Sequence, residues 1–151
     1  MSKEQDTTVL LSKLLCVSRQ LKRSLQAMNT DPNLNNSTLS VIFQLEHHSM
    51  KMNDIADYLC ITLGAATSLV DKLERQDIVE RIRSVEDRRI IYVQLTEIGK
   101  EKVQSLRNHI LNEAKVIFSK ASDADLQNYI LLAESLESLL VSYNESTSKQ
   151  S

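Results

Sequence analysis

Apolar residues recur every three to four positions through most of the chain, which is the spacing of an amphipathic α-helix. In the first such run, Leu14, Leu21 and Leu25 share one face. The pattern predicts helices over residues of about 5–28, 37–45, 53–59, 62–76, 97–120 and 123–143. Helix-capping residues support several of these starts, because Thr62, Thr96 and Ser122 can each accept a hydrogen bond from the first turn. Asn36 or Ser37 is the candidate cap of the second helix.

The period changes between residues 78 and 95. Two β-branched, partly alternating segments, 78–83 and 90–95, are separated by the charged segment 84–89. This pattern predicts a two-stranded hairpin with a long polar tip. The fold class is therefore mainly α with a small β-hairpin.

Composition narrows the range of possible functions. The 151 residues contain 2 Gly, 1 Pro and 2 Cys, which excludes a Gly-rich nucleotide loop, a disulfide scaffold and a Cys-built zinc finger. No apolar run is long enough for a membrane span and the first residues are polar, so we expect a soluble, cytoplasmic protein. We expect a single domain over 1–151, with a disordered polar tail at 145–151.

The segment from Met52 to Asp71 carries the strongest signal, because it fits two helices that cross through a short turn. Every inward position of that pattern is apolar or small: Ile55, Ala56, Leu59, Ile61, Ala66 and Leu69. Cys60 occupies the turn position where Gly often supplies a positive φ, so we expect a turn of another shape. Two ordinary amphipathic helices in a bundle are the alternative interpretation.

The hairpin follows the second of these helices directly, and that order is typical of a winged helix-turn-helix. Its tip carries Arg88 and Arg89. The narrow minor groove of DNA attracts an inserted Arg, so these charges favour DNA contact over a solvated turn.

Four segments, 69–75, 78–81, 86–89 and 94–99, resemble the MarR family of bacterial transcriptional regulators. The Asp-x-Arg of the wing and the Leu-Thr-Glu-x-Gly after it are the most specific parts, and the resemblance covers about 39–103. It implies a winged helix-turn-helix in which Arg89 enters the minor groove, Asp87 orients Arg89 by a hydrogen bond, and Arg88 reaches phosphate. Asp77 stands where the family usually has Gly, and it tolerates the left-handed conformation.

The resemblance also assigns the DNA-binding surface. The implied residues are Thr62, Leu63, Gly64, Ala65, Thr67, Ser68, Lys72, Asp87, Arg88 and Arg89. Many relatives carry Arg at the positions of Leu63 and Ser68. Without those arginines, hydroxyls and apolar contacts to thymine methyls remain for base reading, which predicts weak reading or A·T-rich sites.

A homodimer is expected from the long terminal helices, about 5–30 and 97–144, which flank a DNA-binding lobe at about 37–96. The last helix is apolar over more than one face and needs more than one partner. The expected interface residues are Leu10, Leu14, Leu21, Leu126, Tyr129, Leu136, Leu140 and Tyr143. A symmetric dimer would bind a near-palindromic operator in double-stranded DNA. A monomer with a self-contained core is the alternative.

The predicted function is a sequence-specific transcriptional regulator, a dimeric repressor released by a small effector of unknown identity. The alternative is a winged-helix module that binds proteins and reads DNA weakly or not at all. We expect no enzyme, cofactor or catalytic residue, because no nucleophile–base pair or phosphate loop is present. Glu46-His47-His48 is interpreted as a surface helix end rather than a zinc site. Cys16 and Cys60 are expected to be buried, unreactive thiols.

Overall fold

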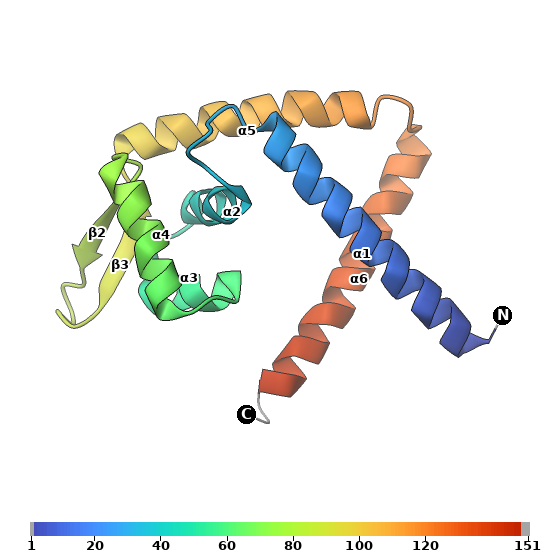
Figure 1. Ribbon diagram of the computed structural model, residues 1–151, viewed down its shortest axis with the longest axis horizontal. Helices are drawn as coiled ribbons and strands as arrows, with labels where there is room; N and C mark the ends of the chain where they lie inside the picture. Colours follow the sequence, from blue (N-terminus) through green and yellow to red (C-terminus); the bar gives the residue numbers. More distant parts are fainter. Residues whose placement is uncertain (1, 149–151) are drawn as a thin grey trace. The chain divides into compact units, whose positions relative to one another are not determined.

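The computed structural model describes residues 2–148 (Figure 1). The elements are α1 (Lys3–Met28), α2 (Asn36–Leu45), β1 (Met50–Lys51), α3 (Met52–Leu59), α4 (Leu63–Arg75), β2 (Val79–Arg83), β3 (Ile91–Leu95), α5 (Glu97–Ile117) and α6 (Asp123–Ser148). The mainly helical class and the winged helix-turn-helix expected from the sequence are confirmed. The chain divides into two compact units, Met1–Leu111 and Asn112–Ser151.

The predicted helix caps are present with one change of position. The Thr62 hydroxyl accepts from the Ala65 N–H at 3.2 Å, and the Thr96 hydroxyl accepts from Gly99 at 2.9 Å. Ser122 caps α6 in the same way, since its hydroxyl accepts from the backbone N–H three residues on. The cap of α2 is Asn35 rather than Asn36 or Ser37. Asn35 is favoured because its own N–H donates to the hydroxyl of Thr38, three residues on, which completes a reciprocal pair of hydrogen bonds.

The sheet has three antiparallel strands in the order β1-β3-β2 within the described residues, one strand more than the sequence predicted. Residues of β2 and β3 pair in a regular hairpin register, with Arg81 opposite Val93. On the other side of β3, Met50 of β1 also faces Val93. A two-residue strand is too short to show alternation, so only its pairing with β3 identifies it.

One hydrophobic core joins the helix-turn-helix, the sheet and the start of α5. Its largest fully buried side chains include Leu34, Ile42, Ile55, Leu73, Ile78, Val93 and Val103. Two of these residues lie in loops, one before α2 and one between α4 and β2. The others lie in α2, α3, α4, β3 and α5. The shared core therefore holds α4 and the hairpin in a fixed arrangement relative to each other.

Two ion pairs tie α5 to the segments before and after α2. Lys102 pairs with Asp31 in the α1–α2 loop, and this hydrogen bond holds the pKa of the Asp31 carboxyl below its ordinary value. Arg107 pairs with Glu46 at the end of α2. The Arg107 guanidinium also lies 5.4 Å from the centre of the Phe43 ring, within the range of a cation–π contact.

The end of the chain differs from the sequence prediction of a disordered tail at 145–151. Residues 145–148 continue α6, while 149–151 lie outside the described residues. The hydroxyls of Ser146 and Thr147 both donate to the Tyr143 carbonyl, at 2.7 and 3.2 Å. These polar side chains are satisfied within the helix, so polar composition alone did not indicate disorder here.

Gly99 gives a testable constraint on this fold. A Cβ at this position would stand 2.9 Å from the carbonyl carbon of Ile78 and closer still to its oxygen. Because the obstacle is backbone, we expect Gly99→Ala to lower the free energy of unfolding by about 3 kcal/mol. Denaturant titration followed by circular dichroism measures this change. Gly64→Ala is the matched control, since nothing lies within 4 Å of its added carbon. Equal stabilities for the two variants would contradict the close contact.

Candidate nucleic-acid interface

The turn between α3 and α4 has the left-handed conformation, although Cys60 stands where Gly often supplies it. Cys60 has φ 54° and ψ 43°, so the expected turn of another shape is wrong. The strain is offset because the Cys60 N–H donates to Ala56 and Asp57, and the Ile61 N–H donates to Ala56 at 3.0 Å. The Cys60 side chain is exposed, so it does not fill the core as expected.

The inward positions of the helix-turn-helix lie where the sequence predicted them. Ile55, Ala56 and Ala66 are buried. Leu59, Ile61 and Leu69 are half-buried and pack against the core. The small side chains of Ala56 and Ala66 belong to the two crossing helices, which is where a close crossing requires them.

The start of α4 is exposed, as a recognition helix requires. The predicted residues Thr62, Leu63, Gly64, Ala65, Thr67 and Ser68 are all exposed, and Lys72 is half-buried. Leu63 is an apolar side chain that is 50% exposed. The Thr67 hydroxyl donates to the Leu63 carbonyl at 2.8 Å, and the Ser68 hydroxyl donates to Gly64 at 3.1 Å.

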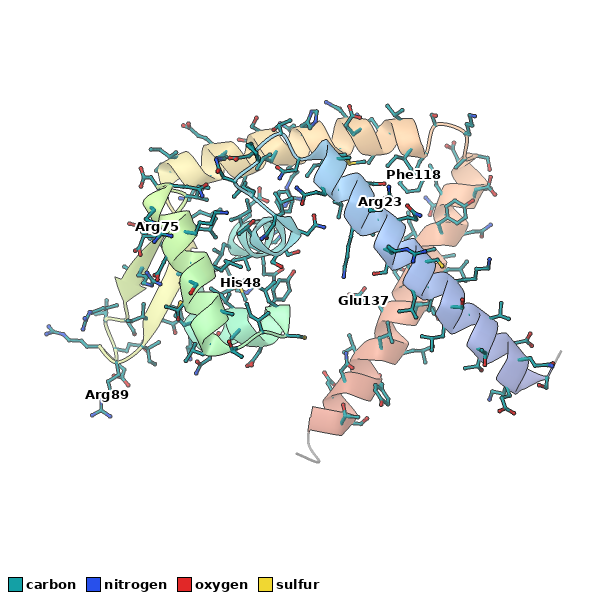
Figure 2. All side chains as sticks on the ribbon, viewed as in Figure 1. Arg23, His48, Arg75, Arg89, Phe118 and Glu137 are labelled. Carbon is teal, nitrogen blue, oxygen red and sulfur yellow. The ribbon has the colours of Figure 1, made fainter. Side chains whose placement is uncertain are left out.

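The wing tip is ordered by two short polar side chains. The Ser84 hydroxyl accepts from the backbone N–H groups of Glu86 and Asp87. Asp87 accepts from Arg89 at 2.9 Å, as expected, but the donor is the backbone N–H of Arg89 rather than its guanidinium. Asp87 therefore shapes the loop, and Arg89 extends from its tip (Figure 2). Among the described residues, neither Arg88 nor Arg89 forms an ion pair.

Arg81 joins the wing to the recognition helix, a role that the sequence did not reveal. Its guanidinium lies 2.6 Å from Asp71 and also pairs with Glu74, both on α4. Only the packing of β2 beside α4 brings these residues together. The spacing of the two acids, one turn apart on α4, was the available signal for a shared cation.

The connection from α4 to β2 confirms the expected role of Asp77. Asp77 has a φ of 56°, in the left-handed region. Its N–H donates to Glu74 at 2.9 Å, and the Ile78 N–H donates to Leu73 at 3.0 Å. These bonds end the helix and direct the chain into the first strand of the wing.

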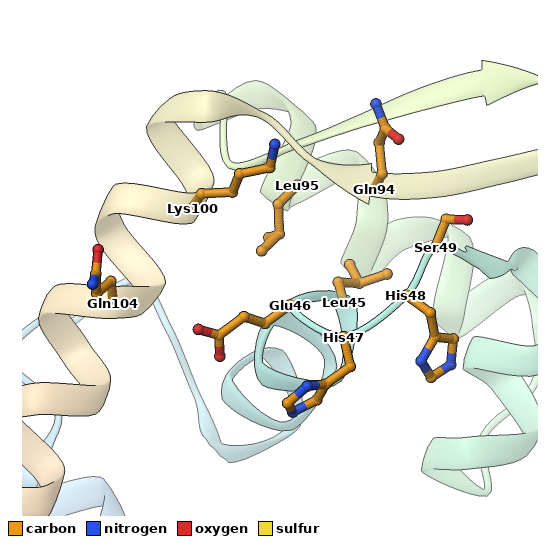
Figure 3. A pocket seen from close by; sticks show the side chains of 9 residues that line it. All are labelled: Leu45, Glu46, His47, His48, Ser49, Gln94, Leu95, Lys100 and Gln104. Atoms are coloured by element: carbon orange, nitrogen blue, oxygen red, sulfur yellow. The ribbon is translucent and has the colours of Figure 1, made fainter.

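A shallow cavity of about 440 Å³ lies between the end of α2, β3 and the start of α5 (Figure 3). Glu46, His47 and His48 line it, together with Lys100. Figure 3 shows the Glu46 side chain and the two imidazole rings pointing in different directions. Among residues 2–148, no three His, Cys, Asp or Glu side chains are grouped to hold a metal ion.

The apolar stripes of the long helices are largely exposed in each unit. On α1, Leu10 and Leu21 are 49% and 55% exposed, and Leu14 is half-buried. Cys16 on the same helix is exposed rather than buried, and its Sγ lies 3.8 Å from a guanidinium nitrogen of Arg19.

The last helix repeats this pattern. On α6, Tyr129, Leu140 and Tyr143 are all more than half exposed, while Leu126 and Leu136 are half-buried. None of the described helices is both long and apolar enough to cross a membrane.

Comparison with known proteins agrees with this geometry. A model of the MarR family matches residues 34–91. Over 106 residues the chain is 35% identical to the uncharacterised HTH-type transcriptional regulator YfiV of Bacillus subtilis, a match covering 70% of this chain and 64% of that protein. The chain thus spans less than two thirds of the length of YfiV.

Solved structures show the same fold over nearly the whole chain. The transcriptional regulator BldR of Sulfolobus solfataricus has a TM-score of 0.78 at 24% identity, covering 93% of this chain and 99% of that one. A MarR family protein from Bacillus stearothermophilus has a TM-score of 0.80 at 17% identity, with the same coverage. Residues 34–91 are thus similar in sequence to the MarR family, and the fold is similar to that of solved regulators.

Proposed function

We propose that this protein is a DNA-binding transcriptional regulator that acts as a homodimer on a near-palindromic site. The observation that carries the proposal is the exposed start of α4 together with two exposed arginines at the wing tip, neither of which forms an ion pair within residues 2–148. A helix of this kind fits the major groove, and a charged wing beside it fits the adjacent groove or backbone.

The distribution of charge supports DNA contact in spite of a formal net charge of −2. Asp71 and Glu74 would repel phosphate if they stood alone on α4. The single guanidinium of Arg81 pairs with both carboxylates and offsets half of their combined negative charge. In the hairpin, residues 83–89 carry three Arg against two acids. The charges close to the DNA matter more than the net charge of the protein, because salt largely screens charges that lie more than about 8 Å from a phosphate.

Dimerisation is supported by the exposed apolar stripes of α1 and α6. Tyr143 on α6 is 65% exposed, and Leu21 on α1 is 55% exposed. Monomeric proteins rarely leave contiguous apolar faces of this kind in water. A second copy of the chain is the natural partner, since two-fold symmetry would present two α4 helices to two half-sites.

Repression is the proposed mode of action, with the dimer occluding a promoter in the cytoplasm. A small effector would release the dimer by binding more tightly to a conformation that fits the operator poorly. This part of the proposal rests on the similarity of the chain to the MarR family, and no cavity is assigned to the effector.

Selection of bound sequences from random duplex DNA tests the proposal. We expect recovery of a near-palindrome with half-sites about 34–36 Å apart, which is one turn of DNA. Affinity for the recovered duplex should fall with salt at a log–log slope of about −0.9 for each phosphate neutralised. If a folded dimer recovers no sequence at low salt, the protein-interaction module becomes the better interpretation.

Arg89→Ala tests the wing. Loss of the exposed guanidinium should weaken binding of the selected duplex about tenfold, the effect of losing one charged contact worth about 1.4 kcal/mol. The salt slope should also become shallower if Arg89 neutralises a phosphate. Fluorescence anisotropy with labelled duplex measures both quantities. Arg19→Ala, which removes an arginine from α1, is the matched control, and unchanged affinity for Arg89→Ala would remove the wing from the mechanism.

Leu140→Glu tests the proposed role of α6. A charge in a buried apolar interface is costly, so the variant should sediment as a monomer or unfold, and circular dichroism separates these outcomes. Ser138→Glu places the same charge on the opposite face of α6 and should remain dimeric. A Leu140→Glu variant that sediments as a stable dimer would refute the assignment.

A further inference from the structure

The face of α4 that is directed away from the core begins with small residues. Ala66, Val70 and Leu73 are buried and define the inner face of the helix. Gly64 and Ser68 lie on the opposite side, because 3.6 residues make one turn. The first turn of α4 therefore has almost no side-chain bulk on the face directed away from the core. A helix shaped in this way can approach another surface very closely.

The fold itself gives no reason for glycine at position 64. An added Cβ would meet nothing within 4 Å, and Gly64 does not have a positive φ. Glycine within a helix is less stable than alanine, since it loses more backbone freedom on folding. By contrast, Gly99 lies directly against the Ile78 backbone and is required by packing. A glycine at position 64 is thus explained if another molecule comes close to this face of the helix.

The residues around Gly64 offer apolar contact and hydrogen-bond acceptors. Leu63 is 50% exposed and presents an aliphatic side chain beside the gap. The hydroxyls of Thr67 and Ser68 donate their hydrogens to helix carbonyls. Their exposed oxygens can therefore only accept a hydrogen bond from outside. Neither guanidinium nor carboxamide groups occur at residues 62–68, so the usual bidentate contacts to guanine or adenine cannot form there.

In the major groove, the A·T pair matches an apolar side chain next to hydrogen-bond acceptors. Thymine carries the C5-methyl, which is the apolar group of the groove, and its partner adenine offers an N6 amino donor. A cytosine also offers an amino donor but has no methyl group. An apolar side chain next to acceptor hydroxyls therefore favours A·T pairs.

We propose that α4 recognises thymine methyl groups through Leu63, and that Gly64 is the residue that lets the helix come close enough to make this contact. Thr67 and Ser68 accept hydrogen bonds from the neighbouring adenine. The inference rests on the proposed DNA-binding function and specifies which DNA chemistry that function reads.

Uracil substitution tests the contact one methyl group at a time. Deoxyuridine pairs as thymidine does and removes only the C5-methyl. In the duplex recovered by selection, each thymine is replaced singly and then in both half-sites. We expect one replaced thymine to weaken binding about fourfold and the symmetric pair about fifteenfold, the effect of one and two lost methyl burials.

Variants of α4 assign the effect to residues. Leu63→Ala should bind the thymine and uracil duplexes equally, whereas Leu63→Met should keep the preference. Ile98→Ala is the matched control, because it removes an aliphatic side chain of similar exposure, 56%, from α5. Gly64→Ala should weaken binding of both duplexes while its melting temperature stays at or above that of the wild type.

The outcomes distinguish a failure of thymine recognition from a failure of the proposed DNA binding. If no duplex is bound at low salt, DNA binding itself fails. If the wild type binds tightly but tolerates uracil at every position, thymine recognition is overturned while DNA binding stands. Full discrimination by Leu63→Ala, or unchanged affinity of Gly64→Ala, would likewise overturn the roles of those residues. Loss of binding only when guanines are replaced by 7-deazaguanine would assign base reading to a cationic residue instead.

Discussion

The close contact at the carbonyl of Ile78 determines how the functional parts of this protein are held together. Ile78 is fully buried, and its N–H donates to Leu73 in the last turns of α4. Its carbonyl accepts from the Thr96 N–H at 3.1 Å, at the point where the hairpin ends and α5 begins. The backbone of Gly99 lies against the same carbonyl. The backbone of this one residue thus links the recognition helix, the wing and the start of α5, and a side chain at position 99 would separate them.

This junction explains why Arg81 can serve both the wing and the helix. Once Asp77 turns the chain in the left-handed region, β2 runs beside α4 and brings Arg81 to Asp71 and Glu74. The ion pairs are partly exposed, so their contribution to stability is small. Their larger effect is electrostatic, because the guanidinium of Arg81 offsets part of the negative charge of Asp71 and Glu74 on a surface that is proposed to meet phosphate.

The sequence predicted the architecture well because its signals are local. Helix periods, the hydroxyl caps and the apolar positions of the helix-turn-helix all depend on residues a few positions apart. Contacts between distant segments were missed: the pairing of β1 with β3 and the Arg81 cluster have no short-range pattern. Cys60 shows a related limit, since three backbone hydrogen bonds around the turn outweigh the intrinsic preference of cysteine. A disordered tail was predicted from composition, and helix-internal hydroxyl bonds reversed that expectation for residues 145–148.

The proposed mode of DNA reading also gives dimerisation a role in specificity. A few arginines and one half-buried lysine per protomer neutralise few phosphates, so the sequence-independent part of the binding energy is small. A methyl contact discriminates only modestly between bases, because one buried methyl is worth about 0.8 kcal/mol. Two α4 helices bound to one operator add these energies, so the discrimination factors multiply. A protomer without its partner would lose the second factor, and with it most of the distinction between operator and other DNA. The apolar stripes of α1 and α6, which contact no DNA in this proposal, would then determine specificity as much as Leu63 does.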